Sequence, residues 1–591
     1  MTAIPTARPK PAPFVPQSFD GTHWGQIEPL LRALLERPVR SRAELERWLI
    51  DRGELEAACG EARAMLYIAM TCDTEDKATQ QAYSAYIEDV PPKFKPLSFE
   101  LDKRQVAMTK EHRLVEAPER GDRFMVLARD TEADVALFRP ENVPLETELT
   151  LLAQKFDQTV GAMTAVFDGR EQTFPQMARY AESTDRAVRE GAWRAVSERR
   201  LKDADTVDAI FDEMLGLRHK VARNAGFDDY IGYTFKSKHR FDYGPKECFD
   251  FHAGCEKAVV PLIRRLDEQR KRALKVDALR PWDLAVDIKG RAPLRPFSGG
   301  VDLVNKSRVV FDRLDPRLGE MFRSLGDGAN ARGPVDGACL DLDSRKGKAP
   351  GGYQYMLDRS RRPFIFMNAA GMQHDVSTML HEAGHAFHSM LCIDEPLLAY
   401  RASPMEFAEV ASMSMEMITL NHWGDPGAYY ADEVQLARAR RHQIESAVSV
   451  LPWIATIDAF QHWIYANPTH TRDQRRAFWL TLDDRFGHAV DWRGLETARA
   501  NHWHRQKHIF DYPFYYIEYG IAQLGALGLW LISLEQGEKK AVELYTRALS
   551  LGGSRPLPDL FAAAGLKFDF GPGTVSRLVE RVERELEKLP E

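Results

Sequence analysis

Two histidines four residues apart, in the segment His381-Glu-Ala-Gly-His385, constrain this chain more than any other feature. Residues 375–380 and 386–391 on either side are mostly apolar, so the pattern predicts one long helix through the segment. Side chains four residues apart on a helix lie on one face, roughly 6 Å from each other. Two imidazoles at that separation can bind one metal ion. The alternative, an ordinary helix with solvated or core histidines, would require other partners for any buried imidazole.

A catalytic zinc ion takes three protein ligands and keeps a fourth position for water. Glu382 is offset by about 100° along the helix from the first histidine and can lean toward that water. A second, largely apolar helix is predicted at residues 405–416, and its carboxylates at Glu406, Glu409 and Glu416 share one face. A carboxylate on an apolar face is costly unless it is paired or bound to a metal. Spacing alone does not choose among these three acids.

The composition is that of a globular protein without a nucleic-acid partner. The chain has 591 residues, 44% of them hydrophobic and 28% charged, so two or more subdomains are expected. Its net charge of −7 provides no basic surface for nucleic acid. Its six cysteines are scattered without a close pair and are expected to be buried, reduced thiols.

The sequence predicts no membrane partner. Residues 1–20 are rich in proline and lack the apolar core of a signal peptide, so they are predicted to form an extended arm. The longest uncharged run, residues 519–534, is shorter than the ~20 residues that cross a bilayer. We therefore expect a cytoplasmic location.

The fold class is predicted to be mainly α with a small β element. Helical patterns cover residues 24 to 116, with a break expected at Pro91-Pro92. Residues 162–174 read as a β-hairpin with an Asp-Gly turn. Helices follow, with an interruption expected at residues 230–240, and they fill the chain beyond the histidine motif.

Two short strands are predicted directly before the helix that carries the histidines. They span residues 352–357 and 363–368, and the charged connection at 358–362 suits a turn in solvent. A sheet edge beside a metal site can bind an extended peptide through its backbone. A purely structural hairpin is the alternative.

A cluster of aromatic residues follows late in the chain, where His508 precedes Tyr512, Tyr515, Tyr516 and Tyr519. On spacing alone such rings belong more often to a core than to a catalytic site. Several hydroxyl groups beside a histidine nevertheless need hydrogen-bond partners.

The chain resembles peptidase family M3, which includes thimet oligopeptidase and bacterial oligoendopeptidase F. The resemblance rests on the His381–His385 segment followed by Phe407-Ala-Glu409-Val-Ala-Ser, and residues 341–348 and 351–353 are similar to further family segments. It implies a two-lobed helical metallopeptidase with a deep central channel. The implied division is an N-terminal helical lobe at residues 21–200 and a catalytic domain at 201–591.

In this family the glutamate after Phe-Ala supplies the third zinc ligand. The resemblance therefore implies that His381, His385 and Glu409 bind one Zn²⁺ per chain. Glu406 and Glu416 then become structural residues or partners that orient the ligands.

A histidine and tyrosines in the matching family segment donate hydrogen bonds to the tetrahedral intermediate. Carried over to this chain, those donors are His508, Tyr512 and Tyr519. Tyr515 and Tyr516 stay open as alternatives, because the mammalian members have a glycine-richer segment with one more residue between the histidine and the first tyrosine.

Motif and resemblance together predict a zinc-dependent endopeptidase that cleaves short, unstructured oligopeptides, with Glu382 as general base. Two alternatives stay open. One is a helical zinc exopeptidase, such as a carboxypeptidase or dipeptidase, and the other is a non-catalytic, peptide-binding relative.

Overall fold

The computed structural model of the protein describes residues 13–116, 122–329, 339–345, 347–349 and 351–590. The first twelve residues of the predicted arm lie outside this part of the chain. The described residues are mainly helical with two small sheets, which confirms the predicted fold class. The chain forms two compact units: unit 1 takes residues 1–135, 297–404 and 543–560, and unit 2 takes residues 136–296, 405–542 and 561–591. The lobe boundary expected at residue 200 stays a prediction.

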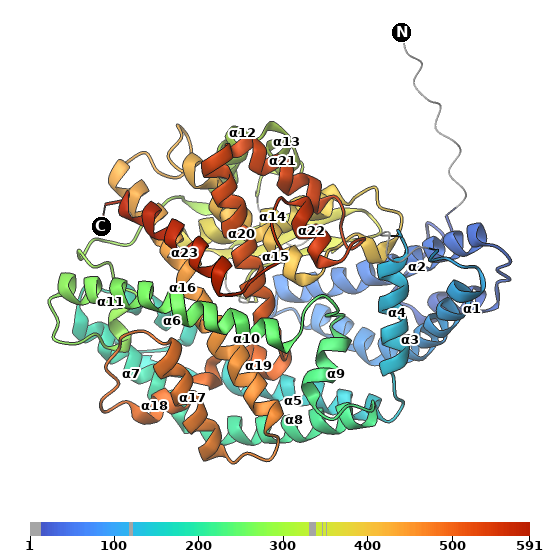
Figure 1. Ribbon diagram of the computed structural model, residues 1–591, viewed down its shortest axis with the longest axis horizontal. Helices are drawn as coiled ribbons and strands as arrows, with labels where there is room; N and C mark the ends of the chain where they lie inside the picture. The colour runs from blue at the N-terminus through green and yellow to red at the C-terminus, as the bar shows by residue number, and fades with distance from the viewer. Residues whose placement is uncertain (1–12, 117–121, 330–338, 346, 350, 591) are drawn as a thin grey trace, which may run out of the picture. The chain divides into compact units, whose positions relative to one another are not determined.

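Unit 1 combines helices from two distant stretches of the chain with a three-stranded sheet (Figure 1). In the first stretch α2 and α3 pack along each other and α1 packs against both. In the second, α14 packs against the sheet. The helices of unit 1 are α1 (Trp24–Glu36), α2 (Arg42–Cys72), α3 (Lys77–Glu111), α12 (Gly299–Leu314), α13 (Pro316–Arg323) and α14 (Gln373–Leu391).

The end of the predicted arm packs against unit 1. Val15 and Phe19 are buried in its core. The guanidinium group of Arg359 donates to the carbonyl of Phe19 at 2.9 Å and to that of Pro16 at 2.7 Å. Residues 13–20 are therefore held by apolar burial and by backbone hydrogen bonds.

The predicted helix break at Pro91-Pro92 is wrong, because α3 continues through both prolines and through Pro96. Proline in a helix interior removes a backbone hydrogen bond and commonly ends the helix. Here Val90 and Leu101 on either side are buried in the core of unit 1. Tertiary packing of an apolar helix face outweighs the local preference.

The sheet of unit 1 confirms the two predicted strands and adds a third. Its strands are β3 (Leu340–Asp343), β4 (Tyr353–Leu357) and β5 (Arg362–Ala369), in the order β3-β5-β4. The predicted pair β4 and β5 is antiparallel, whereas β3 runs parallel to β5. Strand β4 is an edge strand beside α14, and Gln354 on it donates to Ser389 Oγ at 3.4 Å.

Unit 2 is built almost entirely from helices, with α5 beside α8 and α16 beside α17 (Figure 1). These helices are α5 (Asn142–Gly161), α6 (Phe174–Ala178), α7 (Arg186–Lys202), α8 (Ala204–Asn224), α9 (Tyr230–Ser237), α10 (Pro245–Gly254), α11 (Val260–Leu274), α15 (Met405–Ile418), α16 (Glu433–Ala466), α17 (Arg472–Phe486), α18 (Glu496–Ala500), α19 (Lys507–Asp511), α20 (Tyr516–Gln536) and α23 (Pro572–Glu587). Three more helices contain residues of both units: α4 (Met125–Leu137), α21 (Glu538–Leu549) and α22 (Leu557–Ala563).

The predicted β-hairpin is present in unit 2 as β1 (Thr164–Phe167) and β2 (Arg170–Thr173), paired antiparallel. Asp168 and Gly169 form the turn, with φ of +53° and +69°. Two consecutive positive φ angles define the type I′ turn that an Asp-Gly sequence favours.

The interruption predicted at residues 230–240 is wrong over most of its length, since Tyr230–Ser237 forms α9. The Asp229 side chain caps this helix by accepting the backbone N–H of Gly232 at 2.8 Å. Tyr230 and Phe235 bury its apolar face. A cap and one buried face suffice for a short helix here.

Helix α20 is longer than the uncharged run at residues 519–534. Among the described residues it is the one helix that is long and apolar enough to cross a membrane, and 89% of its apolar window is buried inside the protein. It packs against α15 and α16 within unit 2. The apolar residues of α20 therefore belong to the helical core of unit 2.

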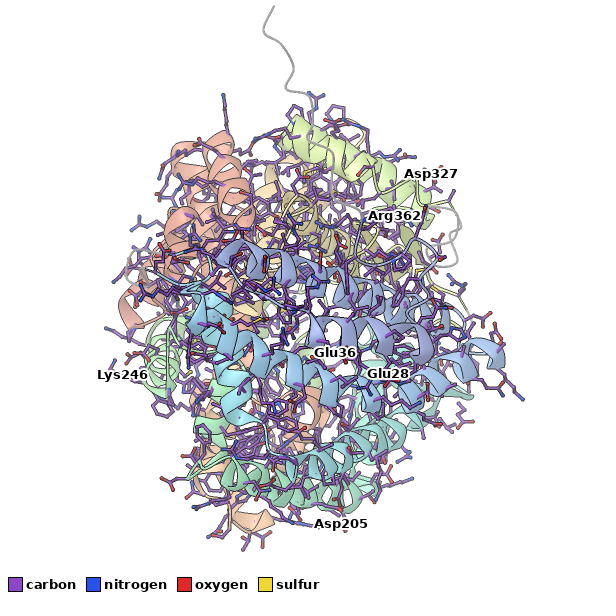
Figure 2. All side chains as sticks on the ribbon, turned by 90° about the vertical axis from the view of Figure 1, so that its right-hand side faces the viewer. Glu28, Glu36, Asp205, Lys246, Asp327 and Arg362 are labelled. Carbon is purple, nitrogen blue, oxygen red and sulfur yellow. The ribbon has the colours of Figure 1, made fainter. Side chains whose placement is uncertain are left out.

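Side chains are distributed as the composition predicts. All six cysteines are free and buried, which confirms that prediction. Charged side chains such as Glu36, Asp205 and Lys246 are exposed and point outward (Figure 2).

Candidate metal and catalytic site

The two histidines of the motif lie on α14, within unit 1. The helix is capped by Asp375, whose carboxylate accepts the backbone N–H groups of Ala370 and Met372, both at 2.8 Å. The rings of His381 and His385 have centroids 4.9 Å apart and planes at 83° to each other. Both side chains are partly exposed. The predicted helix therefore presents two neighbouring imidazoles on one face.

The neighbours of these imidazoles on α14 are buried. Glu382 is 6% exposed. Nε2 of His388 lies 3.0 Å from the hydroxyl of Ser403, which donates its single proton to the carbonyl of Gly552 at 3.0 Å. His388 must therefore be the donor to Ser403. Burial and the nearby His385 lower the pKa of His388 to about 3, so this ring is a neutral group that holds α14 in place.

Glu409 lies on α15, within unit 2, and its carboxylate is buried. Oε2 accepts a hydrogen bond from the hydroxyl of Ser412 at 3.0 Å. Oε1 accepts one from the hydroxyl of Tyr515 at 3.5 Å. Hydroxyl donors of this kind fix the orientation of metal-binding carboxylates.

The other two acids predicted on the same helix face have different partners in unit 2. Glu416 accepts a hydrogen bond from the amide of Gln443 at 2.8 Å. Glu406 accepts one from the hydroxyl of Tyr243 at 2.7 Å and lies 3.7 Å from Nε of Arg240. Burial raises the pKa of Glu406. These contacts separate three carboxylates that spacing alone does not distinguish.

Arg240 is a residue that sequence reasoning missed. Its side chain is buried, and its Nη2 donates to Glu518 at 2.7 Å and to the carbonyl of Phe514 at 2.5 Å. Lys238 also contacts Glu518, at 3.1 Å. Arginine is mostly exposed in proteins, so nothing in the local pattern indicates burial. These contacts connect α9 and its end to the segment that carries the predicted tyrosines.

His508 lies on α19, and four tyrosine rings surround it within unit 2. The ring centroids of Tyr516, Tyr515, Tyr519 and Tyr512 lie 5.0, 5.5, 6.1 and 6.3 Å from that of His508. Tyr512 is 58% exposed, whereas the other three are partly buried. Burial raises the pKa of those three hydroxyl groups, so each keeps its proton at neutral pH.

The protonation of His508 is set by a chain of two hydrogen bonds. The indole N–H of Trp453, which can only donate, points at Oε1 of Gln506 at 3.0 Å. The amide nitrogen of Gln506 must then face Nδ1 of His508, 2.9 Å away, and donate to it. Burial, with Lys507 and Lys238 nearby, lowers the pKa of His508 to about 4. His508 is therefore a neutral imidazole with its proton on Nε2.

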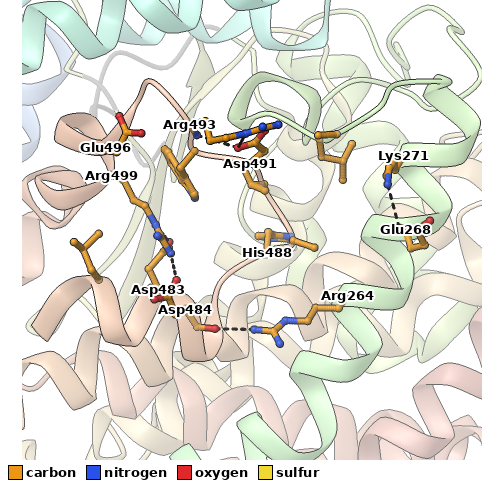
Figure 3. Close-up of a pocket in the computed structure, with 16 residues that line it drawn as sticks. Arg264, Glu268, Lys271, Asp483, Asp484, His488, Asp491, Arg493, Glu496 and Arg499 are labelled. Carbon is orange, nitrogen blue, oxygen red and sulfur yellow. Dashed lines mark hydrogen bonds and ion pairs between the residues drawn. The ribbon is translucent and has the colours of Figure 1, made fainter. Parts of the chain in front are cut away.

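A pocket of about 760 Å³ in unit 2 is lined by a different set of residues (Figure 3). Its charged residues largely pair with one another: Arg499 donates to Asp483 and Asp484, both at 2.5 Å, and Arg493 lies 2.7 Å from Asp491. None of the predicted site residues is among those that line it. Because its charges are mutually neutralised, we assign no chemistry to this pocket.

A family model described as peptidase family M3 matches residues 179–572, which is more than half of the 591-residue chain. Oligopeptidase PepF of Bacillus subtilis (strain 168) is 24% identical over 359 residues, covering 59% of this chain and 49% of that protein. Oligopeptidase A of Escherichia coli (strain K12) is 25% identical over 284 residues, covering 39% of this chain and 41% of that protein. This chain therefore aligns with about half the length of these curated relatives.

Solved structures extend the similarity to nearly the whole chain. The structure of PZ peptidase A with inhibitor 2 has a TM-score of 0.86 at 25% identity, covering 98% of this chain and 99% of that one. An X-ray structure described as oligoendopeptidase F has a TM-score of 0.85 at 26% identity, covering 98% and 99%. The mainly helical fold predicted from the resemblance agrees with both.

Proposed function

Because this chain belongs to peptidase family M3, we propose that it is a zinc-dependent endopeptidase that cleaves short, unstructured oligopeptides in the cytoplasm. We propose that His381, His385 and Glu409 hold one catalytic Zn²⁺. The observation that carries the proposal is the pair of imidazoles on one face of α14, with ring centroids 4.9 Å apart.

The chemistry of these donors fits zinc. Two imidazoles and one carboxylate form a zinc ligand set that leaves a fourth position open. Glu409 is buried, and hydroxyl groups of Ser412 and Tyr515 already orient its carboxylate. When bound, the ion supplies a Lewis acid for the peptide carbonyl and lowers the pKa of a water from 15.7 toward ~7.

Glu382 is proposed as the general base. It follows His381 directly on α14, and its side chain is buried. Its carboxylate takes a proton from the attacking water and passes that proton to the leaving amine. General acid–base catalysis of this kind typically contributes about 10²–10⁴-fold to the rate.

Neutral donors from residues 508–519 are proposed to stabilise the oxyanion. Nε2–H of His508 is available for this purpose because Gln506 occupies Nδ1. Tyr512 and Tyr519 are proposed beside it, whereas the single hydroxyl proton of Tyr515 is donated to Glu409. Each preorganised donor is typically worth about 3–4 kcal/mol in the transition state.

The proposed substrate is an extended oligopeptide bound along strand β4. The printed names of the relatives are those of oligopeptidases and oligoendopeptidases, which supports this class. Strand β4 is at the edge of the sheet and packs against α14 within unit 1. Backbone N–H and C=O groups of an edge strand can pair with an extended peptide.

The test combines product analysis with one substitution. We expect a quenched fluorogenic peptide, blocked at both ends, to be cut at an internal bond. Glu382→Gln should keep zinc but lower kcat/KM by at least about 10²-fold. Glu416→Gln is the matched control, since Glu416 is held by Gln443 and should stay within a few-fold of wild type. Near-normal turnover by Glu382→Gln, or release of terminal residues only, would overturn the proposal.

A further inference from the structure

Four side chains with metal-binding atoms meet inside unit 2, where α10 packs against α16. Helix α10 contributes Cys248 and His252, and α16 contributes Asp458 and His462, so each helix presents two residues four positions apart. Sγ of Cys248, a carboxylate oxygen of Asp458 and a ring nitrogen of His462 all lie within 4.8 Å of one another. None of the four residues is more than 3% exposed.

Several polar atoms of this cluster are buried without a hydrogen bond. Oδ2 of Asp458 is 2.8 Å from Nε2 of His252, which donates to it. Within the described part of the chain, Oδ1 of Asp458 and Nδ1 of His462 have no hydrogen-bond partner, and Nε2 of His462 has only a long contact of 3.5 Å with Oδ2 of Asp458. Leaving such a buried polar atom unsatisfied destabilises the folded protein. Two such atoms beside one long contact indicate a missing partner.

The side of the cluster around His462 is aromatic, and the buried guanidinium of Arg240 lies near Cys248. The rings of Phe249, Phe514 and Phe235 lie 4.9, 5.0 and 6.0 Å from the ring of His462. Apolar walls of this kind offer no hydrogen bonds to the open nitrogens or to the free carboxylate oxygen. A cation bound among the donor atoms would satisfy the free carboxylate oxygen and one ring nitrogen of His462 together.

We propose that this cluster is a second, buried zinc site in which Cys248, Asp458 and His462 are the ligands. Thiolate, imidazole and carboxylate are all common zinc donors. Around a tetrahedral ion with bonds of about 2.0–2.3 Å, ligand atoms lie roughly 3.3–3.7 Å apart, so small side-chain rotations suffice. Oδ1 of Asp458 binds the ion while Oδ2 keeps its bond to His252, which orients the carboxylate. A water completes the coordination.

The proposed ion would also stiffen the segment that carries the catalytic tyrosines. Gln461, next to His462 on α16, accepts the backbone N–H of Phe514 at 3.0 Å. Phe514 in turn lies against His462 and directly precedes Tyr515. Fixing His462 therefore fixes the position of Phe514 and of the tyrosines beside it.

The test uses the full chain produced in medium that contains Co²⁺ in place of Zn²⁺. A thiolate bound to Co²⁺ gives a near-ultraviolet charge-transfer band, which the histidine and glutamate ligands of the catalytic site do not. We expect this band in the wild-type protein and in the His381→Ala/His385→Ala variant. We expect it to be lost in Cys248→Ser. Cys255→Ser is the matched control, because Cys255 is equally buried and its thiol lies 3.7 Å from the carbonyl of Leu451.

Metal content of the zinc protein gives a second, independent reading. We expect two zinc ions per chain in the wild type and one in Cys248→Ser, with folding checked by circular dichroism. Wild-type cobalt protein without the charge-transfer band would overturn the proposal, even where Cys248→Ser does not fold. So would a band that persists in a folded Cys248→Ser variant. Failure of the catalytic assignment looks different: the band would remain, and His381→Ala/His385→Ala would lose no zinc.

Discussion

Replacing Gln506 by glutamate should make the Nε2–H donor of His508, which is independent of pH in the wild type, dependent on pH. In the wild type the Gln506 amide donates to Nδ1 of His508 at 2.9 Å, which places the ring proton on Nε2. A carboxylate at the same place can only accept, so a neutral His508 would move its proton to Nδ1. The Nε2 donor proposed for the oxyanion is then lost.

The size of the effect follows from the surroundings of His508. Burial and two nearby lysines lower its pKa to about 4, and a carboxylate at hydrogen-bond distance raises a histidine pKa by roughly 1–3 units. The variant ring should therefore titrate between about pH 5 and 7. Below that pKa the imidazolium keeps its Nε2–H, and above it the donor is gone. Loss of one oxyanion donor lowers kcat by about 10²–10³-fold.

The assay is kcat/KM for a fluorogenic peptide from pH 5 to pH 9. The Gln506→Glu profile should fall by about 10²–10³-fold relative to wild type on the alkaline side and recover as the pH drops. Trp453→Phe is the control: it removes the anchor of Gln506 without adding a charge, so a smaller loss and no new limb are expected. A Gln506→Glu profile parallel to the wild type and within about threefold of it would refute the assigned tautomer or the role of His508.

Three other substitutions test the surrounding contacts. Tyr515→Phe removes the hydroxyl that lies 3.5 Å from Glu409 and should weaken zinc binding by about 10–100-fold. The zinc affinity is measured by competition with a chromophoric chelator, and an unchanged affinity would contradict the prediction. Arg240→Met leaves Glu518 buried without its 2.7 Å partner. The free energy of unfolding, measured by denaturant titration, should therefore fall by about 3–5 kcal/mol. A loss below about 1 kcal/mol would refute the stabilising role of the contact between Arg240 and Glu518. Hydrogen bonds to two carboxylates at 3.0 and 2.8 Å raise the pKa of His422 above 6.5. These hydrogen bonds stabilise the folded protein fully below pH 6.5, and that stabilisation is lost as the pH rises through the raised pKa of His422. His422→Gln should therefore flatten the dependence of the free energy of unfolding on pH in this range. Identical curves for the variant and the wild type would count against this prediction.

Features whose geometry is local are the ones that the sequence predicts well. The imidazoles of His381 and His385 share a face because helix spacing alone puts them there. The Asp168-Gly169 turn is equally local, since its two positive φ angles are a preference of those two residues. Pro91 shows the opposite case, where burial of neighbouring side chains outweighs a local rule.

Contacts between distant segments lie beyond this kind of reasoning. Cys248 and His252 form one pair at helical spacing, and Asp458 and His462 form another, yet neither pair is distinctive by itself. Only the packing of α10 on α16 brings the two pairs together. Arg240 is hidden for the same reason, because its partner Glu518 lies far along the chain.

The choice among the tyrosines depends on how the backbone at Phe514 is held. Its φ of +60° is unfavourable for a residue with a side chain and persists only when neighbouring contacts enforce it. Two buried contacts do so: Arg240 donates to the Phe514 carbonyl at 2.5 Å, and the Gln461 side chain accepts its N–H at 3.0 Å. This conformation separates the exposed Tyr512 from Tyr515, which reaches Glu409. The backbone at Phe514 thus divides residues 508–519 into two parts. Tyr515 is held at the proposed metal ligand Glu409, while the exposed Tyr512 can contact a peptide that enters from solvent.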